Sequence, residues 1–274
     1  MTVAQALGAA ARAIETSGHA ASPRREAEEI LGAILGRDRS WLFAHGDEPL
    51  GSDARAALHD GAARRATGEP VAYVTGSATF CDRPFAVSRA TLIPRPETED
   101  IVARARALRP RRILDVGTGT GCLAVTLAIE HPGSRVTGTD VSIDALAVAR
   151  SNAKRHGARV TLARADGLDA LRDRAFDLVV ANPPYVDATD RASLPAEVRD
   201  FEPAVALYSP RGLAHLERWI PAAARCLAPG GSLLVEIGFG QAGPARAIVG
   251  ATPLRLVAIH PDFAGIPRIL EAAR

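Results

Sequence analysis

The four residues Asn182-Pro183-Pro184-Tyr185 have types and an order that suit chemistry on a flat nitrogen, and they follow an apolar run over residues 176–180. Proline fixes its own φ and biases the residue before it toward extended backbone, so we expect Asn182 and Pro183 to be held extended. Neither proline carries an N–H. The Asn182 side-chain oxygen and the Pro183 backbone oxygen can therefore both accept hydrogen bonds, and the pattern predicts a rigid site for a planar NH2 group.

Holding the nitrogen is most of the chemistry that such a site performs. An amide or aromatic amine nitrogen is a poor nucleophile because its lone pair is delocalised, and hydrogen bonds that favour pyramidal geometry strengthen as a methyl group is transferred. We expect Asn182 and Tyr185 to be catalytic, with Tyr185 stacking on the substrate plane, and Asn182, Pro183, Pro184 and Tyr185 all to bind the substrate. No metal or covalent nucleophile is required. The alternative is a rigid Pro-Pro turn without chemistry.

A glycine-rich loop precedes this site in the sequence. Gly117, Gly119 and Gly121 follow an apolar run and precede a helical segment, where glycine permits positive φ and lets the backbone approach a ligand closely. A dinucleotide fingerprint requires G-x-G-x-x-G, but Cys122 occupies the position of its third glycine, so the spacing here is G-x-G-x-G. The loop therefore favours a ligand other than a pyrophosphate.

Two carboxylates end the next two predicted strands. Asp140 lies 19 residues after Gly121, where a carboxylate can accept both hydroxyls of a ribose. Asp166 ends the following strand and is placed to accept from an exocyclic amine such as that of adenine. Either acid alone is more often a helix cap or a surface charge. Together with the glycine loop they favour a nucleoside with a cationic or zwitterionic tail, and S-adenosylmethionine fits this description better than NAD.

An alternation of strands and helices must position these residues. Short apolar runs predict strands at residues 111–117, 134–140, 159–166, 176–185 and 231–238. Helical segments are predicted at residues 121–133, 145–157 and about 212–227. This order is typical of an α/β fold with a doubly wound, mostly parallel sheet and right-handed crossovers. Ligands of such sheets bind beyond the carboxyl ends of the strands, where every residue named above falls.

The first part of the chain predicts a small helical bundle. Val3, Ala6, Leu7 and Ala10 recur at helical spacing. A second helix is predicted over residues 22–36, with Ser22 as N-cap and Pro23 at the first helical position, and two further apolar segments lie at residues 41–43 and from Ser52 onward. Both a packing domain and a docking module for a macromolecular substrate are consistent with this bundle.

A connector follows the bundle. Residues 71–88 alternate apolar and polar side chains around turn formers, which predicts a β-hairpin, and residues 92–100 run into a helix that ends near residue 108. We therefore expect three parts: a helical bundle at 1–68, a β-hairpin connector at 69–93 and a catalytic domain at 94–274.

Composition excludes several classes of protein. The chain has 274 residues, 47% of them hydrophobic, which suffices for one large domain and a small one. A net charge of +2 indicates no strong field for nucleic acid or membrane. The three cysteines are far apart and the histidines lack metal-ligand spacing, so we expect neither disulfides nor a metal. No signal peptide and no apolar run of about 18 residues are found, which predicts a soluble cytoplasmic protein.

The chain closely resembles the protein-(glutamine) methyltransferases that modify the Gly-Gly-Gln loop of peptide chain release factors. The matching stretches are residues 68–99, 113–125, 182–186, 201–207, 227–238 and, more weakly, 262–270. The most specific of them is "LIPRPETE" at residues 92–99, which nucleic-acid methyltransferases with the same tetrapeptide do not generally carry.

The resemblance implies a class I S-adenosylmethionine-dependent methyltransferase with a Rossmann-like fold. It implies that release factors are the protein substrate and that the helical bundle helps to hold them. We further expect that no nucleic acid is required and that the enzyme acts as a monomer. The cofactor contacts that it implies are Gly117, Thr118, Gly119, Thr120, Gly121, Asp140, Asp166, Gly167 and Asn182.

Two departures from the family pattern stand out. The family often has a bulky residue after the acid that ends the third strand, whereas this chain has Gly167, and Ala78 stands where an acid is more usual before the hairpin phenylalanine.

The specific motif also has a physical interpretation. Pro94 and Pro96 stiffen a segment that enters a helix with Glu97 and Glu99 in its first turn. This segment is expected to wall the cofactor pocket, with Arg95 or an acid lining it, and the alternative is an ordinary helix start.

Two other functions remain open on the residues alone. The tetrapeptide at 182–185 also occurs in enzymes that methylate an exocyclic amine of adenine or guanine in nucleic acid, but the near-neutral charge and the lack of a basic, aromatic-interleaved tract disfavour this alternative. The second alternative function is that of a scaffold in translation, a protein that binds the cofactor but has no enzymatic activity.

Overall fold

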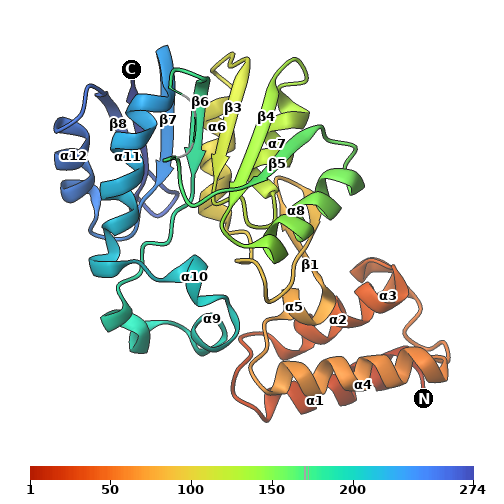
Figure 1. Ribbon diagram of the computed structural model, residues 1–274. Coiled ribbons are helices and arrows are strands. Elements are labelled where there is room, and N and C mark those ends of the chain that lie inside the picture. The colour runs from red at the N-terminus through yellow and green to blue at the C-terminus, as the bar shows by residue number, and fades with distance from the viewer. Residues whose placement is uncertain (170, 172) are drawn as a thin grey trace. The chain divides into compact units, whose positions relative to one another are not determined.

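The computed structural model describes residues 1–169, 171 and 173–274, and the chain forms two compact units (Figure 1). The first, called here the helical unit, comprises Met1–Ser77 together with Leu194–Phe201. The second, called the sheet unit, comprises Ala78–Ser193 and Glu202–Arg274.

Six helices make up the helical unit. They are α1 (Val3–Glu15), α2 (Pro23–Leu35), α3 (Arg39–Ala44), α4 (Ser52–Ala66), α5 (Val71–Thr75) and α9 (Ala196–Phe201). The predicted apolar face of α1 is confirmed, because Val3, Ala6, Leu7 and Ala10 are all buried in one cluster with residues of α2 and α4. Helix α2 begins at Pro23 as predicted, although the side chain of Ser22 makes no capping hydrogen bond.

A buried arginine fastens the late segment of the chain to this unit. Arg65 is 2% exposed. Its guanidinium donates to Glu26 on α2 at 2.7 Å, to the carbonyl of His19 at 2.7 Å and to Glu197 on α9 at 3.4 Å. Residues of this unit that are distant in the sequence thus share one cation.

The segment expected to form a long hairpin is partly helical. Strands β1 (Ser77–Phe80) and β2 (Arg83–Ala86) pair through a turn at Cys81 and Asp82, whose φ values are 47° and 58°. The prediction of strand at residues 71–75 is wrong, because this piece is helix α5. It starts after Pro70 and ends at Gly76 with φ 71°. Five residues are too few to separate a strand period from a helix period.

The predicted sheet is confirmed. Its seven strands lie in the order β5-β4-β3-β6-β7-β9-β8. The first five of these are parallel to one another, β9 runs antiparallel to β7, and β8 runs antiparallel to β9. Their bounds are β3 (Arg112–Val116), β4 (Arg135–Asp140), β5 (Val160–Arg164), β6 (Phe176–Ala181), β7 (Leu227–Glu236), β8 (Arg255–Pro261) and β9 (Pro267–Ala273).

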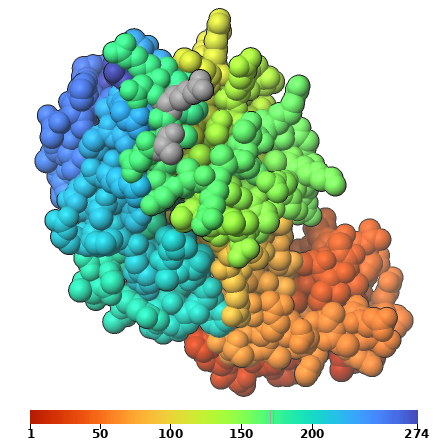
Figure 2. Space-filling model, in the orientation of Figure 1, coloured from red at the N-terminus to blue at the C-terminus, as the bar shows by residue number. Residues whose placement is uncertain are grey.

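Helices cover both faces of the sheet (Figure 1). They are α6 (Glu99–Ala105), α7 (Cys122–Glu130), α8 (Ile143–Arg155), α11 (Ala214–Cys226) and α12 (Ala242–Gly250). The sheet unit also contains the short helix α10 (Ala204–Leu207) and the 3-10 turns η1 (Pro96–Thr98), η2 (Ala188–Ser193) and η3 (Pro210–Gly212). The η2 turn buries no residue and lies at the surface in the space-filling view (Figure 2). Among the described residues, no helix combines the length and the apolarity needed to cross a bilayer.

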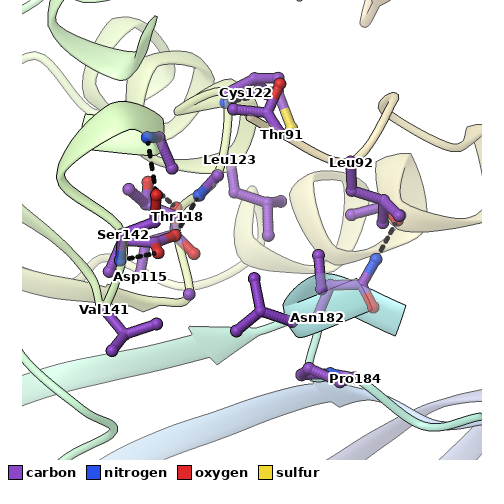
Figure 3. Close-up of a pocket in the computed structure, with 18 of the residues that line it drawn as sticks. Thr91, Leu92, Asp115, Thr118, Cys122, Leu123, Val141, Ser142, Asn182 and Pro184 are labelled. Carbon is purple, nitrogen blue, oxygen red and sulfur yellow. Dashed lines mark hydrogen bonds between the residues drawn. The ribbon is translucent and has the colours of Figure 1, made fainter. Parts of the chain in front are cut away.

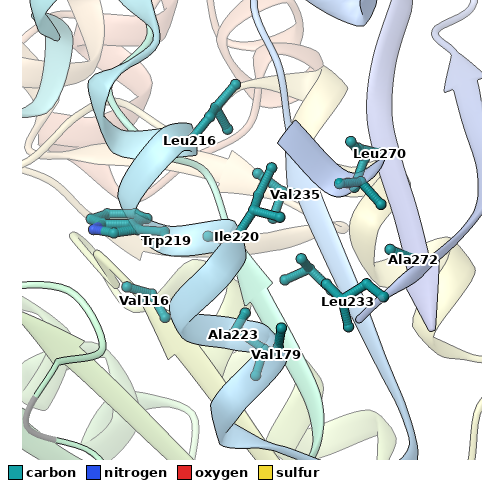
Figure 4. Packing of buried hydrophobic residues seen from close by; sticks show 14 of the residues in the cluster. Val116, Val179, Leu216, Trp219, Ile220, Ala223, Leu233, Val235, Leu270 and Ala272 are labelled. Atoms are coloured by element: carbon teal, nitrogen blue, oxygen red, sulfur yellow. The ribbon is translucent and has the colours of Figure 1, made fainter. Parts of the chain in front are cut away.

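The period of two along each strand sends successive residues to opposite cores. Leu114 of β3 packs with α11 and α12, whereas its neighbour Ile113 packs with α6, α7 and the hairpin. Figure 4 shows the first of these cores, in which Trp219 and Ile220 of α11 lie over the sheet. This burial fixes the strand ends that carry the site.

We expect Arg65→Met to lower the free energy of unfolding by about 3 kcal/mol, because it leaves the Glu26 carboxylate unpaired in a largely buried place. The matched control is Arg25→Met on α2, whose partner Glu29 is exposed, and it should cost less than about 1 kcal/mol. Urea unfolding followed by circular dichroism measures both. Equal losses for the two variants would contradict a structural role for the buried pair.

Candidate active site

A cavity of about 320 Å3 lies beyond the carboxyl ends of the parallel strands (Figure 3). The segments that line it follow β3, β4, β5 and β6, and the motif at residues 92–95 and helix α11 complete the wall. In Figure 3, Asp115, Thr118 and Ser142 gather at one end of the cavity, and Asn182 and Pro184 at the other.

The glycine loop has the backbone that its sequence predicts. Gly117, Gly119 and Gly121 have φ values of 71°, 54° and 79°, a region that residues with a Cβ rarely adopt. A Cβ at Gly121 would also lie 3.1 Å from the Cβ of Ala149 on α8. The loop can therefore follow the cavity wall closely only with glycine at these positions.

Asp115 of β3 accepts hydrogen bonds from the glycine loop and from the helix that follows it. It is 1% exposed, and its Oδ2 accepts from the Thr118 hydroxyl at 2.6 Å and from the backbone N–H of Ala124 at 3.1 Å. Burial raises the pKa of Asp115 to about 7, against the opposing effect of these two hydrogen bonds. Sequence reasoning missed this residue, although an acid inside an apolar strand was the available signal.

Asp140 lines the cavity as predicted and is tied to the glycine loop. Its Oδ2 accepts from the backbone N–H of Gly119 at 2.9 Å, and its Oδ1 accepts from that of Ser142 at 2.9 Å. A carboxylate has about four acceptor positions. Two remain after these bonds, which matches the two hydroxyls of a ribose.

Asp166 also lines the cavity, but an arginine engages it. Arg218 of α11 donates to Asp166 Oδ1 at 2.9 Å and to its backbone oxygen at 2.8 Å, and the Asp166 side chain is 65% exposed. A ligand amine that donates to the Asp166 carboxylate would therefore share this acceptor with Arg218.

Trp219 occupies the space that a side chain at position 167 would need. A Cβ on Gly167, where φ is 67°, would lie 2.6 Å from Trp219 Nε1, and the ring is also 3.4 Å from the place of a Cβ on Gly117. Trp219 lines the cavity and stacks edge-on against His215. The bulky side chain that the family often has after the acid would find no room here, because Trp219 of α11 lies over Gly167. Sequence reasoning missed this contact.

Asn182 is held by a chain of two hydrogen bonds. Its Nδ2 donates to the Thr98 hydroxyl at 2.9 Å, a bond drawn in Figure 3, and that hydroxyl donates to Glu236 Oε2 at 2.5 Å. Thr98 ends η1, and Glu236 is the last residue of β7 and 1% exposed. Neither was singled out from the sequence, although Glu236 ends an apolar strand as Asp140 does.

Of the three other predicted substrate contacts, one lines the cavity and two do not. Pro184 lines the cavity beside Asn182, whereas Pro183 and Tyr185 do not contribute to its wall. Tyr185 lies beside Glu236, and burial raises the pKa of its phenol. Its backbone oxygen accepts from Gln241 at 3.0 Å.

The "LIPRPETE" segment walls the cavity, as predicted, through residues that include Arg95. Arg95 forms an ion pair with the buried carboxylate of Glu202, which also accepts the backbone N–H of Ile93 at 3.1 Å. Glu99 instead accepts the backbone N–H of Cys81 in the hairpin turn at 2.8 Å.

Comparisons with known proteins find matches along nearly the whole chain. Residues 98–200 match the family model of the methyltransferase small domain, and residues 5–76 match that of the PrmC N-terminal domain. A relative from Koribacter versatilis, named release factor glutamine methyltransferase, is 41% identical over 98% of this chain and 98% of its own length. One of the same name from Geobacter sulfurreducens is 42% identical over 90% of this chain and 88% of its own.

A crystal structure of a methyltransferase from Pyrococcus furiosus shares the fold. Its TM-score is 0.54 at 15% identity, over 81% of this chain and 98% of that one.

We expect Gly167→Ala to displace the Trp219 ring and to lower the free energy of unfolding by about 2 kcal/mol, since the new Cβ combines backbone strain with a clash. The control is Gly265→Ala, where φ is 80° but no atom lies within 4 Å of the new Cβ. In a Trp41→Phe background Trp219 is the only tryptophan, so its fluorescence reports the displacement. An unchanged emission spectrum in Gly167→Ala would refute the contact.

Proposed function

Since the chain belongs to the family of release factor glutamine methyltransferases, we propose that it transfers a methyl group from S-adenosylmethionine to the side-chain amide nitrogen of the glutamine in the Gly-Gly-Gln loop of peptide chain release factors. The observation that carries this function is the 41% identity that extends over 98% of the chain. The alternative of a nucleic-acid amine as acceptor is not favoured.

The residues at the cavity fit S-adenosylmethionine. The glycine loop has no side chain at Gly117 and Gly119, which line the cavity, and Asp140 keeps acceptor positions for two hydroxyls. Trp219 offers a flat apolar wall whose Nε1 has no partner among the described residues. We propose that the methyl donor is held by the cofactor contacts that the sequence predicts, which are Gly117, Thr118, Gly119, Thr120, Gly121, Asp140, Asp166, Gly167 and Asn182. All of these except Gly121 line the cavity.

When bound, S-adenosylmethionine supplies an electrophilic methyl group on a sulfonium. The chain itself orients the acceptor nitrogen. Because Asn182 Nδ2 is committed to Thr98, its Oδ1 is the atom that accepts from the substrate amide. Pro183 does not line the cavity, so its backbone oxygen is proposed to accept the second N–H only once the release factor is bound. These acceptors favour the pyramidal nitrogen of the transition state over the flat ground state. The methyl group would pass from the sulfonium to the nitrogen oriented in this way, with a neutral thioether as the leaving group, and the excess amide proton would go to water.

Tyr185 does not line the cavity, so the proposed stacking on the substrate plane requires its ring to become accessible when the release factor binds. The helical unit is proposed to hold the release factor, and the enzyme is proposed to act as a monomer in the cytoplasm, without nucleic acid.

The decisive experiment uses labelled S-adenosylmethionine with three acceptors: purified release factor, ribosomal RNA and DNA. We expect label in the release factor and none in a release factor whose loop glutamine is replaced by alanine. Label in RNA or DNA instead, or label unaffected by the Gln→Ala change, would overturn the proposed function.

We expect Asn182→Ala to lower kcat by roughly 100-fold, because it removes an acceptor that acts on the transition state. Asp140→Ala should weaken cofactor binding by at least about tenfold, since it removes charge-assisted hydrogen bonds, and lower kcat less. Steady-state kinetics measures kcat, and calorimetry measures the dissociation constant of the cofactor. Equal losses of cofactor affinity in the two variants would contradict this division of roles.

A further inference from the structure

We propose that Glu236 is a positioning residue that, through Thr98, fixes which end of the Asn182 side-chain amide faces the substrate. This inference rests on the proposed function, because the substrate group in question is the NH2 of a glutamine amide. Thr98 lines the cavity beside Asn182, Glu236 lies behind both, and neither is proposed to accept from or donate to the substrate.

Three segments far apart in the sequence meet in this chain of hydrogen bonds. Thr98 lies 138 residues before Glu236 and 84 residues before Asn182. Glu236 is 1% exposed and Thr98 is 3% exposed, so water does not compete for either bond. Thr98 and Asn182 line the cavity, whereas Glu236 stands behind them at the end of β7.

The number of protons on each group determines the direction of both bonds. An ionised carboxylate only accepts, and a threonine hydroxyl carries a single proton. Thr98 must therefore donate that proton to Glu236, and it can then only accept from Asn182. The NH2 end of the Asn182 amide is the only end that donates, so Nδ2 faces Thr98 and Oδ1 remains for the substrate. An ionised Glu236 thus selects the amide orientation that accepts an N–H.

Protonation of Glu236 would reverse the direction of both hydrogen bonds. A protonated carboxyl can donate to the Thr98 hydroxyl, which leaves the Thr98 proton free to point at Asn182 and to favour Oδ1 on that side. The amide would then present NH2 to the NH2 of the substrate, and the productive complex would be lost. Only the ionised form of Glu236 supports the reaction.

Burial raises the pKa of Glu236 to about 7. The hydrogen bonds from Thr98 and Tyr185 oppose this rise, as does the charge of Arg268 on β9, whereas the charge of Glu97 on η1 adds to it. Activity should therefore fall as the pH drops through this range. Asp115 has a pKa of about 7 as well, so the profile of the wild type alone does not identify the group, and variants are required.

The kinetic test compares variants of both members of the relay. Glu236→Gln presents Thr98 with either an oxygen or an NH2 group, so it no longer selects one orientation of the Asn182 amide, and it has no proton to lose. We therefore expect a lower kcat and the loss of the acidic limb assigned to Glu236. Glu236→Leu and Thr98→Val break the relay and should each lower kcat by about 100-fold with the cofactor dissociation constant unchanged. Thr98→Ser keeps the hydroxyl and should recover most of the loss seen in Thr98→Val.

Thr126→Val is the matched control for Thr98→Val. Thr126 is fully buried in α7, and its hydroxyl has no hydrogen-bond partner in the described part of the chain. This variant makes the same chemical change in the same sheet unit and should leave kcat and its pH profile unchanged.

A second readout does not depend on turnover. The side-chain NH2 resonances of Asn182, identified in a 15N spectrum by their absence in Asn182→Ala, should shift with a midpoint near pH 7 in the wild type and stay fixed in Glu236→Gln. Resonances that titrate equally in both, or a Thr98→Val enzyme as active as Thr126→Val, would overturn the inference. Failure of the wild type to label release factor would instead overturn the proposed function, and the spectrum would still test the relay.

Discussion

Carboxylates near the carboxyl ends of parallel strands hold the segments of this site in place. Asp115 on β3, Asp140 on β4 and Glu236 on β7 each accept hydrogen bonds from a segment that lines the cavity. A carboxylate removed from water is tolerated only if donors replace its hydration. The loops supply those donors, so the packing of the sheet and the shape of the cavity depend on each other. Loss of one acid would free a loop as well as remove a charge.

Burial also raises the pKa values of two of these acids above those of acids at the surface. Asp115 and Glu236 both have pKa values of about 7 because they are buried. A carboxyl with a raised pKa binds its proton more strongly in the folded state, so its contribution to stability is present at low pH and is lost as the pH rises through 7. Ionised Glu236 therefore costs folding free energy, while the hydrogen-bond directions at Asn182 require it. Stability and function make opposite demands on this one side chain.

Gly167 and Trp219 show how one surface can be built from different positions in the chain. A flat apolar wall at the cavity can come from a large residue after Asp166 or from a helix that packs over a glycine there. Here the Trp219 ring lies so close that any Cβ at 167 would clash with it. The two positions are therefore physically coupled, and Gly167 alone does not indicate that the wall is missing.

The sequence by itself determined the features that depend on neighbouring residues. Positive φ at Gly117, Gly119 and Gly121, the alternation of strands with helices and the parallel sheet were all predicted from short windows, because backbone sterics and side-chain periodicity act locally. The helix at Val71–Thr75 was missed, since so short a segment carries no distinct period.

The tertiary structure alone decided the contacts between segments that are distant in the sequence. These are the relay from Glu236 to Thr98, the Trp219 ring over Gly167, Arg218 on Asp166, and Glu197 on Arg65. No short window contains both partners of any such pair. Each pair forms only because the burial of apolar faces brings strand ends and helices together, and this burial is a property of the whole chain.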